Sequence, residues 1–234
     1  MRLAILETGE PPETIRSNFP GYGEMMEAML APVAPAMTFE RHRIFEGAPF
    51  PDLARADGVL TTGSPAGVYE GHAWIAPLET FLNQAAEARR PQIGICFGHQ
   101  IMAQAFGGTV EKSDEGWGVG VHHYRIDAPQ DWMAPRLGAI ACALSHQDQI
   151  TALPATGRRL GGSEFCEFGV VAYDHAPAAS FQMHPEFNHA FAAALYRARS
   201  ARIGEDLAAE AQASLKGRSD RAAMARWIAA FLRG

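Results

Sequence analysis

Short apolar runs alternate with segments of helical periodicity through the first part of the chain. Apolar or alternating runs of this kind indicate strands, and they occur at 2–6, 37–44, 57–62 and 92–95. Apolar side chains recur at helical spacing over 21–30, over 97–106 and from 75 to just before Arg89. Such alternation of strand and helix is typical of an α/β sheet.

The rest of the chain divides into a strand-rich middle and a helical end. Short strands are expected at 119–126, 139–144, 159–163, 170–173 and 179–183. From about residue 188 the periodicity is helical, and a last helix is expected over 220–232. No repeat, low-complexity tract or linker divides the chain. We therefore expect a single α/β domain over 1–234, with a mostly parallel central sheet flanked by helices and a C-terminal helical extension from about 188.

Composition narrows the class of protein. The 234 residues are 47% hydrophobic and 20% charged, which is globular composition. A net charge of −6 argues against nucleic-acid binding through a basic field. No apolar run approaches the roughly 18 residues of a membrane span, and the four apolar residues at 3–6 are too few for a signal peptide. Three cysteines are too few for a disulfide scaffold. We expect a cytoplasmic protein whose thiols are free for chemistry.

One cysteine stands where a predicted strand meets a predicted helix, in the segment Gly94-Ile-Cys96-Phe97-Gly98. This is the layout of a nucleophile elbow, in which a sharp turn exposes the reactive side chain at the carboxyl end of a strand. The two glycines remove side chains that would collide as strand and helix approach. The helix N-terminus favours a thiolate, and the N–H of Phe97 points to where an oxyanion would form. A buried core cysteine is the alternative interpretation of this segment taken alone.

The later segment His184-Pro185-Glu186 supplies a candidate base for that thiol. Proline disfavours helix at the residue before it, and residues two apart in extended chain share a face. Glu186 is then able to orient the His184 imidazole, which would take the thiol proton. Taken alone, the segment is better explained as a surface turn; taken with the cysteine elbow, it predicts nucleophilic catalysis by Cys96.

Five segments together carry a resemblance to a known family. The sequence resembles class I, triad-type glutamine amidotransferase domains, and most of all the glutaminase domain of GMP synthetase and its stand-alone relatives. The matching segments are 60–65 (LTTGSP), 94–100 (GICFGHQ), 107–108 (GG), 145–148 (SHQD) and 182–186 (QMHPE). They follow the family's order and spacing over about residues 57–187. The resemblance implies a flavodoxin-like fold.

The resemblance also implies a role for each matching residue. It assigns Cys96 as nucleophile, His184 as acid and base, and Glu186 as the group that orients the histidine. Backbone N–H groups of Gly63 and Phe97 would form the oxyanion hole. The residues assigned to glutamine binding are Gln100, Ser145, Gln147 and Asp148. The chain departs from the family's pattern twice: Thr62-Gly63-Ser64-Pro65 replaces a Gly-Gly-Pro loop, and Gln147 stands where glycine is frequent. These changes put the second oxyanion donor and one substrate contact in question.

Three functions stay open at this point. The first is a glutaminase that releases ammonia for an acceptor on a separate partner, because no ATP-binding motif and no synthetase domain are visible. The second is a γ-glutamyl peptidase that acts alone on glutathione-like compounds. The third is a non-catalytic partner or regulatory domain, against which the complete triad counts. Tyr69 and Trp74 are candidates for closing over the substrate, although packing aromatics are the simpler interpretation.

No cofactor or metal is expected. His122 and His123 are adjacent on a predicted strand and therefore point to opposite faces. No Cys-x-x-Cys or His-Glu-x-x-His spacing occurs. Cys142 and Cys166 are expected to be core residues rather than a redox pair.

Overall fold

The computed structural model describes residues 1–234 and contains eleven strands. The strands are β1 (Arg2–Glu7), β2 (Thr38–Arg43), β3 (Gly58–Thr61), β4 (Gln92–Ile95), β5 (Thr109–Lys112), β6 (Gly118–Ile126), β7 (Ala139–His146), β8 (Asp148–Ala152), β9 (Gly157–Gly162), β10 (Val170–Tyr173) and β11 (Ala178–Phe181). Nine of them form one sheet in the order β2-β1-β3-β4-β11-β10-β9-β6-β7, while β5 and β8 pair separately.

The helices lie between and after these strands. They are α1 (Glu13–Arg16), α2 (Tyr22–Leu30), α3 (Ile75–Glu87), α4 (Phe97–Ala105), α5 (His189–Ala198), α6 (Ser200–Ile203), α7 (Glu205–Ser214) and α8 (Arg221–Arg233), with a short 3-10 turn at Ile44–Glu46. None of these helices combines the length and the apolar character that a membrane span requires.

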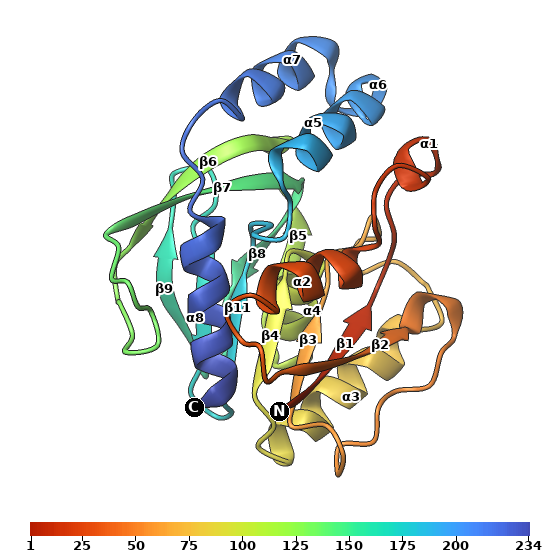
Figure 1. The fold of residues 1–234 in the computed structure, drawn as a ribbon, viewed down its shortest axis with the longest axis vertical. Helices are drawn as coiled ribbons and strands as arrows, with labels where there is room; N and C mark the ends of the chain where they lie inside the picture. Colours follow the sequence, from red (N-terminus) through yellow and green to blue (C-terminus); the bar gives the residue numbers. More distant parts are fainter.

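The sheet has a parallel half and an antiparallel half. Strands β2, β1, β3, β4 and β11 pair in parallel, whereas β11, β10, β9, β6 and β7 pair antiparallel with one another. The expected α/β class, a parallel central sheet flanked by helices, is confirmed. In Figure 1 the strand β1 points toward the end of the molecule where α5, α6 and α7 lie, and both chain termini lie at the opposite end.

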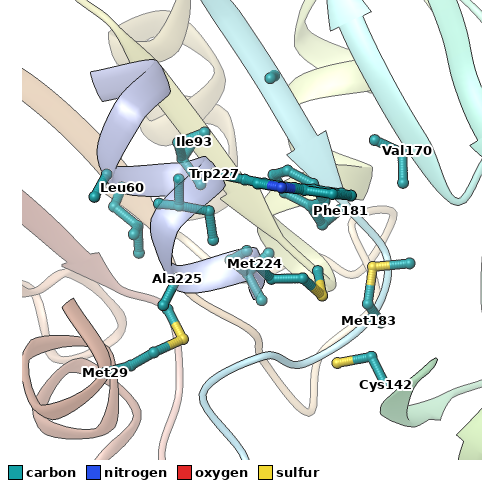
Figure 2. Close-up of a cluster of buried hydrophobic side chains, with 14 of the residues drawn as sticks. Met29, Leu60, Ile93, Cys142, Val170, Phe181, Met183, Met224, Ala225 and Trp227 are labelled. Atoms are coloured by element: carbon teal, nitrogen blue, oxygen red, sulfur yellow. The ribbon is translucent and has the colours of Figure 1, made fainter. Parts of the chain in front are cut away.

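Each face of the parallel half is covered by a separate apolar core. Helices α2 and α8 contact each other and cover one face, whereas α3 and α4 cover the other. The first core is large: Trp227 and Met224 of α8 pack over Ile93 and Phe181, as Figure 2 shows. The second core joins Leu78 and Phe81 of α3 to Phe97 and Ile101 of α4.

The C-terminal helices do two different things. Helix α8 returns to the sheet, and the residue before it, Asp220, exchanges two hydrogen bonds with the backbone of Ala141 in β7. Helices α5 and α7 instead pack against β6 beyond the parallel half. They enclose a third apolar cluster that includes Phe191, Leu195 and Tyr196. This arrangement brings the turn between α5 and α6 next to the carboxyl ends of the central strands.

Candidate active site

Cys96 sits at the junction of β4 and α4 in a strained backbone conformation. Its φ of 52° and ψ of −101° lie outside the regions that L-residues normally occupy. The neighbouring glycines make this close turn possible. A Cβ at Gly94 would lie 2.4 Å from the carbonyl oxygen of Gly98, and one at Gly98 would lie 2.2 Å from that of Thr61. The predicted elbow, with glycine on both sides of the cysteine, is confirmed as a backbone feature.

His184 and Glu186 form a buried pair after β11. His184 Nδ1 lies 2.7 Å from Glu186 Oε1, and the two residues are 4% and 2% exposed. A turn over Pro185 and Glu186 brings them together, since the Phe187 N–H donates to the His184 carbonyl. The imidazole also stacks on the Phe187 ring, with centroids 3.9 Å apart.

Contacts from other elements fix this pair further. The backbone N–H of His184 donates to the carbonyl of Ala143 in β7, and the Arg221 guanidinium of α8 donates to the carbonyls of Pro185 and Glu186. Burial opposes protonation of His184, but the negative charges of Cys96 and Glu186 outweigh it and raise the pKa of the imidazole above its ordinary value. This environment therefore favours the imidazolium form of His184.

Gly63 lies between His184 and Cys96. A Cβ at this position would lie 2.7 Å from His184 Cε1 and 3.7 Å from Cys96 Cβ. No side chain other than hydrogen therefore fits between them without displacing the imidazole. Gly63 lies two residues after the end of β3, and Cys96 directly follows β4.

Thr62 and Ser64, which differ from the family's Gly-Gly-Pro pattern, hold the loop around Gly63 in position through hydrogen bonds with Thr8. Thr62 Oγ1 accepts from the backbone N–H of Thr8 at 3.1 Å, and the Thr8 hydroxyl bonds the Gly63 carbonyl at 3.1 Å. The Ser64 hydroxyl donates to the Thr8 carbonyl at 2.6 Å and accepts from the N–H of Ala66. The backbone N–H groups of Gly63 and Phe97 donate to no backbone carbonyl.

A cavity of about 330 Å³ opens beside the cysteine. Cys96, Gln100, Ser145, Gln147 and Asp148 all line it. Gln100 Nε2 donates to the Asp148 carbonyl at 2.7 Å and so ties α4 to β8. The other residues expected in the site, Gly63, Phe97, His184 and Glu186, are not part of the cavity lining and approach the cysteine from the protein side.

Asp148, one of the two acidic side chains of the cavity, has a defined partner. The Tyr69 hydroxyl donates to Asp148 Oδ1 at 3.0 Å, and Asp148 Oδ2 lies beside Gly67. Tyr69 is 55% exposed and borders the cavity, whereas Trp74 packs on the Phe97 ring with centroids 5.4 Å apart. Packing is thus the observed role of Trp74, and Tyr69 belongs to the cavity wall.

Several cavity residues have no counterpart among the residues predicted from the sequence. They are Glu70, Lys112, Trp117, His146, Arg199 and Arg202. Arg199 and Arg202 come from the turn between α5 and α6 and from α6, more than a hundred residues after Cys96. No motif marks them, because a single arginine at a helix end has no local sequence signal.

The remaining candidate residues lie in the core. Cys142 and Cys166 are almost completely buried, and burial raises the pKa of both thiols far above the usual range. Figure 2 shows Cys142 among apolar side chains, as predicted. His122 is only half-buried, outside that core, and its Nε2 donates to the Val119 carbonyl. No group of three or more His, Cys, Asp or Glu residues is arranged to hold a metal ion.

Comparison with known proteins decides the family. The sequence model of glutamine amidotransferase class-I matches residues 37–198, which is more than half of the chain. The chain belongs to the class-I glutamine amidotransferases. One subunit of a glutamine-hydrolysing GMP synthase from Archaeoglobus fulgidus is 33% identical over 150 residues, covering 64% of this chain and 77% of that protein. Gamma-glutamyl peptidase 3 of Arabidopsis thaliana is 29% identical over 156 residues, covering 62% and 61%.

Solved structures support the same fold. A glutamine amidotransferase from Thermotoga maritima superposes with a TM-score of 0.79 at 17% identity, covering all of this chain and 96% of that one. One from Methylobacillus flagellatus superposes with a TM-score of 0.72 at 20% identity, covering 99% and 92%. At 17% and 20% identity, these two superpositions show that the fold is shared and nothing further.

Proposed function

We propose that this class-I glutamine amidotransferase hydrolyses the side-chain amide of glutamine with Cys96 as nucleophile, His184 as acid and base, and Glu186 as the orienting carboxylate. One observation supports the proposal above all. The turn that holds Cys96 and the pair formed by His184 and Glu186 come from different parts of the chain, and both lie next to Gly63. The strained cysteine turn and the buried histidine–glutamate pair leave between them room for a hydrogen atom but not for a methyl group.

The first half of the reaction forms a thioester. The Cys96 thiolate attacks the side-chain carbonyl carbon, and negative charge moves to the carbonyl oxygen. The unpaired N–H groups of Gly63 and Phe97 are available to stabilise that oxyanion. His184 then gives its proton to the departing nitrogen, the carbon–nitrogen bond breaks, and ammonia leaves.

The second half restores the enzyme. Neutral His184 takes a proton from a water molecule, whose oxygen attacks the thioester carbon. The carbon–sulfur bond breaks, glutamate is released, and the thiolate again faces the imidazolium. Glu186 stays ionised throughout and stabilises the positive charge each time it forms on His184.

The cavity residues suit an amino-acid substrate. Gln100, Ser145, Gln147 and Asp148 line the side of the cavity formed by α4, the end of β7 and the start of β8. We propose that this side binds the α-amino and α-carboxyl groups, with Asp148, held by Tyr69, facing the ammonium. Small enclosed sites with convergent polar groups are typical of such ligands.

The ammonia would serve an acceptor on a separate partner protein in the cytoplasm. The support is indirect: the related archaeal protein is named as one subunit of GMP synthase, and no phosphate-binding loop motif occurs in this chain.

A second candidate function is hydrolysis of γ-glutamyl compounds with a larger leaving group. A second cavity of about 540 Å³ lies across the Ser64–Ala66 loop, and the two cavities share that loop together with Arg199 and Arg202. A leaving group larger than ammonia has space there. The Arabidopsis relative is named as a γ-glutamyl peptidase.

Glutamate release from glutamine and from glutathione, measured in parallel, tests both candidates. Turnover of glutamine supports the first, and preference for glutathione supports the second. In either case Cys96→Ala should lower the rate by at least about a thousandfold, while the matched control Cys166→Ala retains it. A glutamine-like electrophile should label Cys96 alone in peptide mapping. Full activity of Cys96→Ala, or an adduct on Cys142, would overturn the proposed mechanism.

A further inference from the structure

Arg199 lines the catalytic cavity without an acidic partner. It ends α5 and precedes α6, and its half-buried side chain reaches back to β7. Its Nη1 donates to Ser145 Oγ at 2.7 Å, the side chain's single hydrogen bond, and that acceptor is neutral. Arg199 also lies one residue beyond the part of the chain matched by the family model. The family assignment therefore gives it no role.

Several other arginines of this acidic protein have a carboxylate partner. Arg41 pairs with Glu24 at 2.9 Å and Glu27 at 3.2 Å, and Arg43 pairs with Glu10 at 3.0 Å. At the cavity, by contrast, Arg202 lies over the Trp117 ring at 4.8 Å, and Arg199 has only Ser145. A half-buried guanidinium with one neutral partner keeps most of its donors free for an anion.

The position of Arg199 in the cavity is compatible with binding the carboxylate end of a glutamyl substrate. Ser145 lies two residues along β7 from Ala143, whose carbonyl accepts from the His184 backbone. Two residues of strand span about 6.6 Å. In glutamine, four carbon–carbon bonds of about 1.5 Å separate the amide carbon from the carboxylate carbon, roughly 5 Å when extended. Cys96, Ser145 and Arg199 line the same cavity, so an anchor beside Ser145 borders the space that a glutamyl chain attached at Cys96 would enter.

We propose that Arg199 binds the α-carboxylate of the glutamyl substrate and so selects compounds that carry this group. The inference rests on the proposed function, since it places the glutamyl chain between Cys96 and Ser145. Ser145 orients the guanidinium, and Asp148, on the same cavity wall, remains for the α-ammonium. A carboxylate on the leaving group would meet the same chemistry, and the ligands below distinguish the two sources.

Binding to the inactive Cys96→Ala protein isolates recognition from catalysis. Calorimetry or NMR titration would compare glutamine, glutaramate, which lacks the α-ammonium, and 4-aminobutanamide, which lacks the α-carboxylate. Adding Arg199→Met should raise the Kd of glutamine and of glutaramate about 10- to 100-fold and leave that of 4-aminobutanamide within about twofold. Arg199→Lys should recover part of the loss. The control is Arg197→Met, because exposed Arg197 bonds Gln212 and lies outside the cavity lining.

Three results would overturn the inference. Equal weakening of all three ligands together with a lower melting temperature would make Arg199 a structural residue. A loss confined to γ-glutamylglycine, with glutamine unaffected, would assign it to the leaving-group carboxylate. Unchanged affinities in Arg199→Met, in a protein that binds glutamine, would remove it from recognition. Absence of glutamine binding by the Cys96→Ala protein itself would overturn the proposed function as well, so the two failures are distinguishable.

Discussion

The two sides of the cavity that we propose to be catalytic are built by different halves of the fold. On the reacting side, Gly63 and Cys96 follow neighbouring parallel strands, and the backbone is packed so closely that a Cβ at Gly94 or Gly98 would lie under 3 Å from a carbonyl oxygen. On the recognition side, Ser145, Asp148 and Arg199 come from an antiparallel strand, a separate two-strand ladder and a helix junction. Side-chain hydrogen bonds, rather than backbone contacts, hold these residues together. The reacting side should therefore tolerate almost no change, and the recognition side should respond in graded steps.

The largest effect that this comparison predicts is on the reacting side, at Glu186. Glu186→Gln keeps the size of the side chain but cannot balance an imidazolium, so kcat should fall about a thousandfold or more. KM should change little, because Glu186 lies outside the cavity lining. Steady-state kinetics with the exposed Glu87→Gln as control would check this, since Glu87 ends α3. A Glu186→Gln enzyme with near-normal kcat would remove the carboxylate from the mechanism.

The next effect concerns the fit at Gly63. Gly63→Ala would place a methyl group 2.7 Å from His184 Cε1, and Phe187 and Glu186 leave the ring no free direction in which to move. A displaced base should cost about a hundredfold in kcat. Gly71→Ala is a matched control because nothing lies within 4 Å of that position. If both variants kept full activity, the close approach of His184 to Gly63 would have no catalytic importance.

A buried, neutral histidine also lies behind each side of the cavity. His99 of α4 bonds Ser180 Oγ, and His146 of β7 bonds the Asp148 carbonyl. Burial lowers the pKa of each to about 3. Between that value and about 6.5 the unfolded chain binds protons that the folded protein excludes, so stability falls as the pH falls.

Each of these histidines should lower the free energy of unfolding by about 2 kcal/mol between pH 7 and pH 5. Urea denaturation at the two pH values would measure this. His99→Gln and His146→Gln should each show a correspondingly smaller acid loss, whatever their stability at pH 7. An unchanged pH dependence in both variants would mean that the histidines are protonated in the folded protein.

The same division explains what could be predicted from the sequence. The parallel half has strands buried on both faces and helices with one clear apolar face, so the ends of β1, β3, β4, α2, α3 and α4 are predicted to within about one residue. Cys96 is predicted because an elbow requires glycines at fixed positions. Its partners His184 and Glu186 lie two apart, which a local pattern can reveal.

On the recognition side β6 and β7 are predicted from the sequence, but the other elements lack such signals. Strand β5 is mostly exposed and polar, and α7 buries little more than Ala208 and Ala211, so neither shows a strong periodicity. Strand β8 pairs only with β5, and the sequence pattern does not predict it. Arg199 reaches Ser145 across 54 residues of chain. Contacts of this kind depend on how the third apolar cluster packs α5 against β6, and no short pattern encodes them.

The smallest predicted effect tests the graded character of the recognition side at Asp148. Asp148→Asn keeps the hydrogen bond from Tyr69 but removes the negative charge, and the exposed rim of the cavity lets water compensate in part. We expect KM for glutamine to rise about tenfold with little change in kcat, because a single charge-assisted hydrogen bond is weakened. Glutaramate, which has no ammonium, should inhibit the native and variant enzymes almost equally. A matching fall in kcat would show instead that Asp148 positions the reacting groups, and the two sides of the cavity would then be one rigid unit.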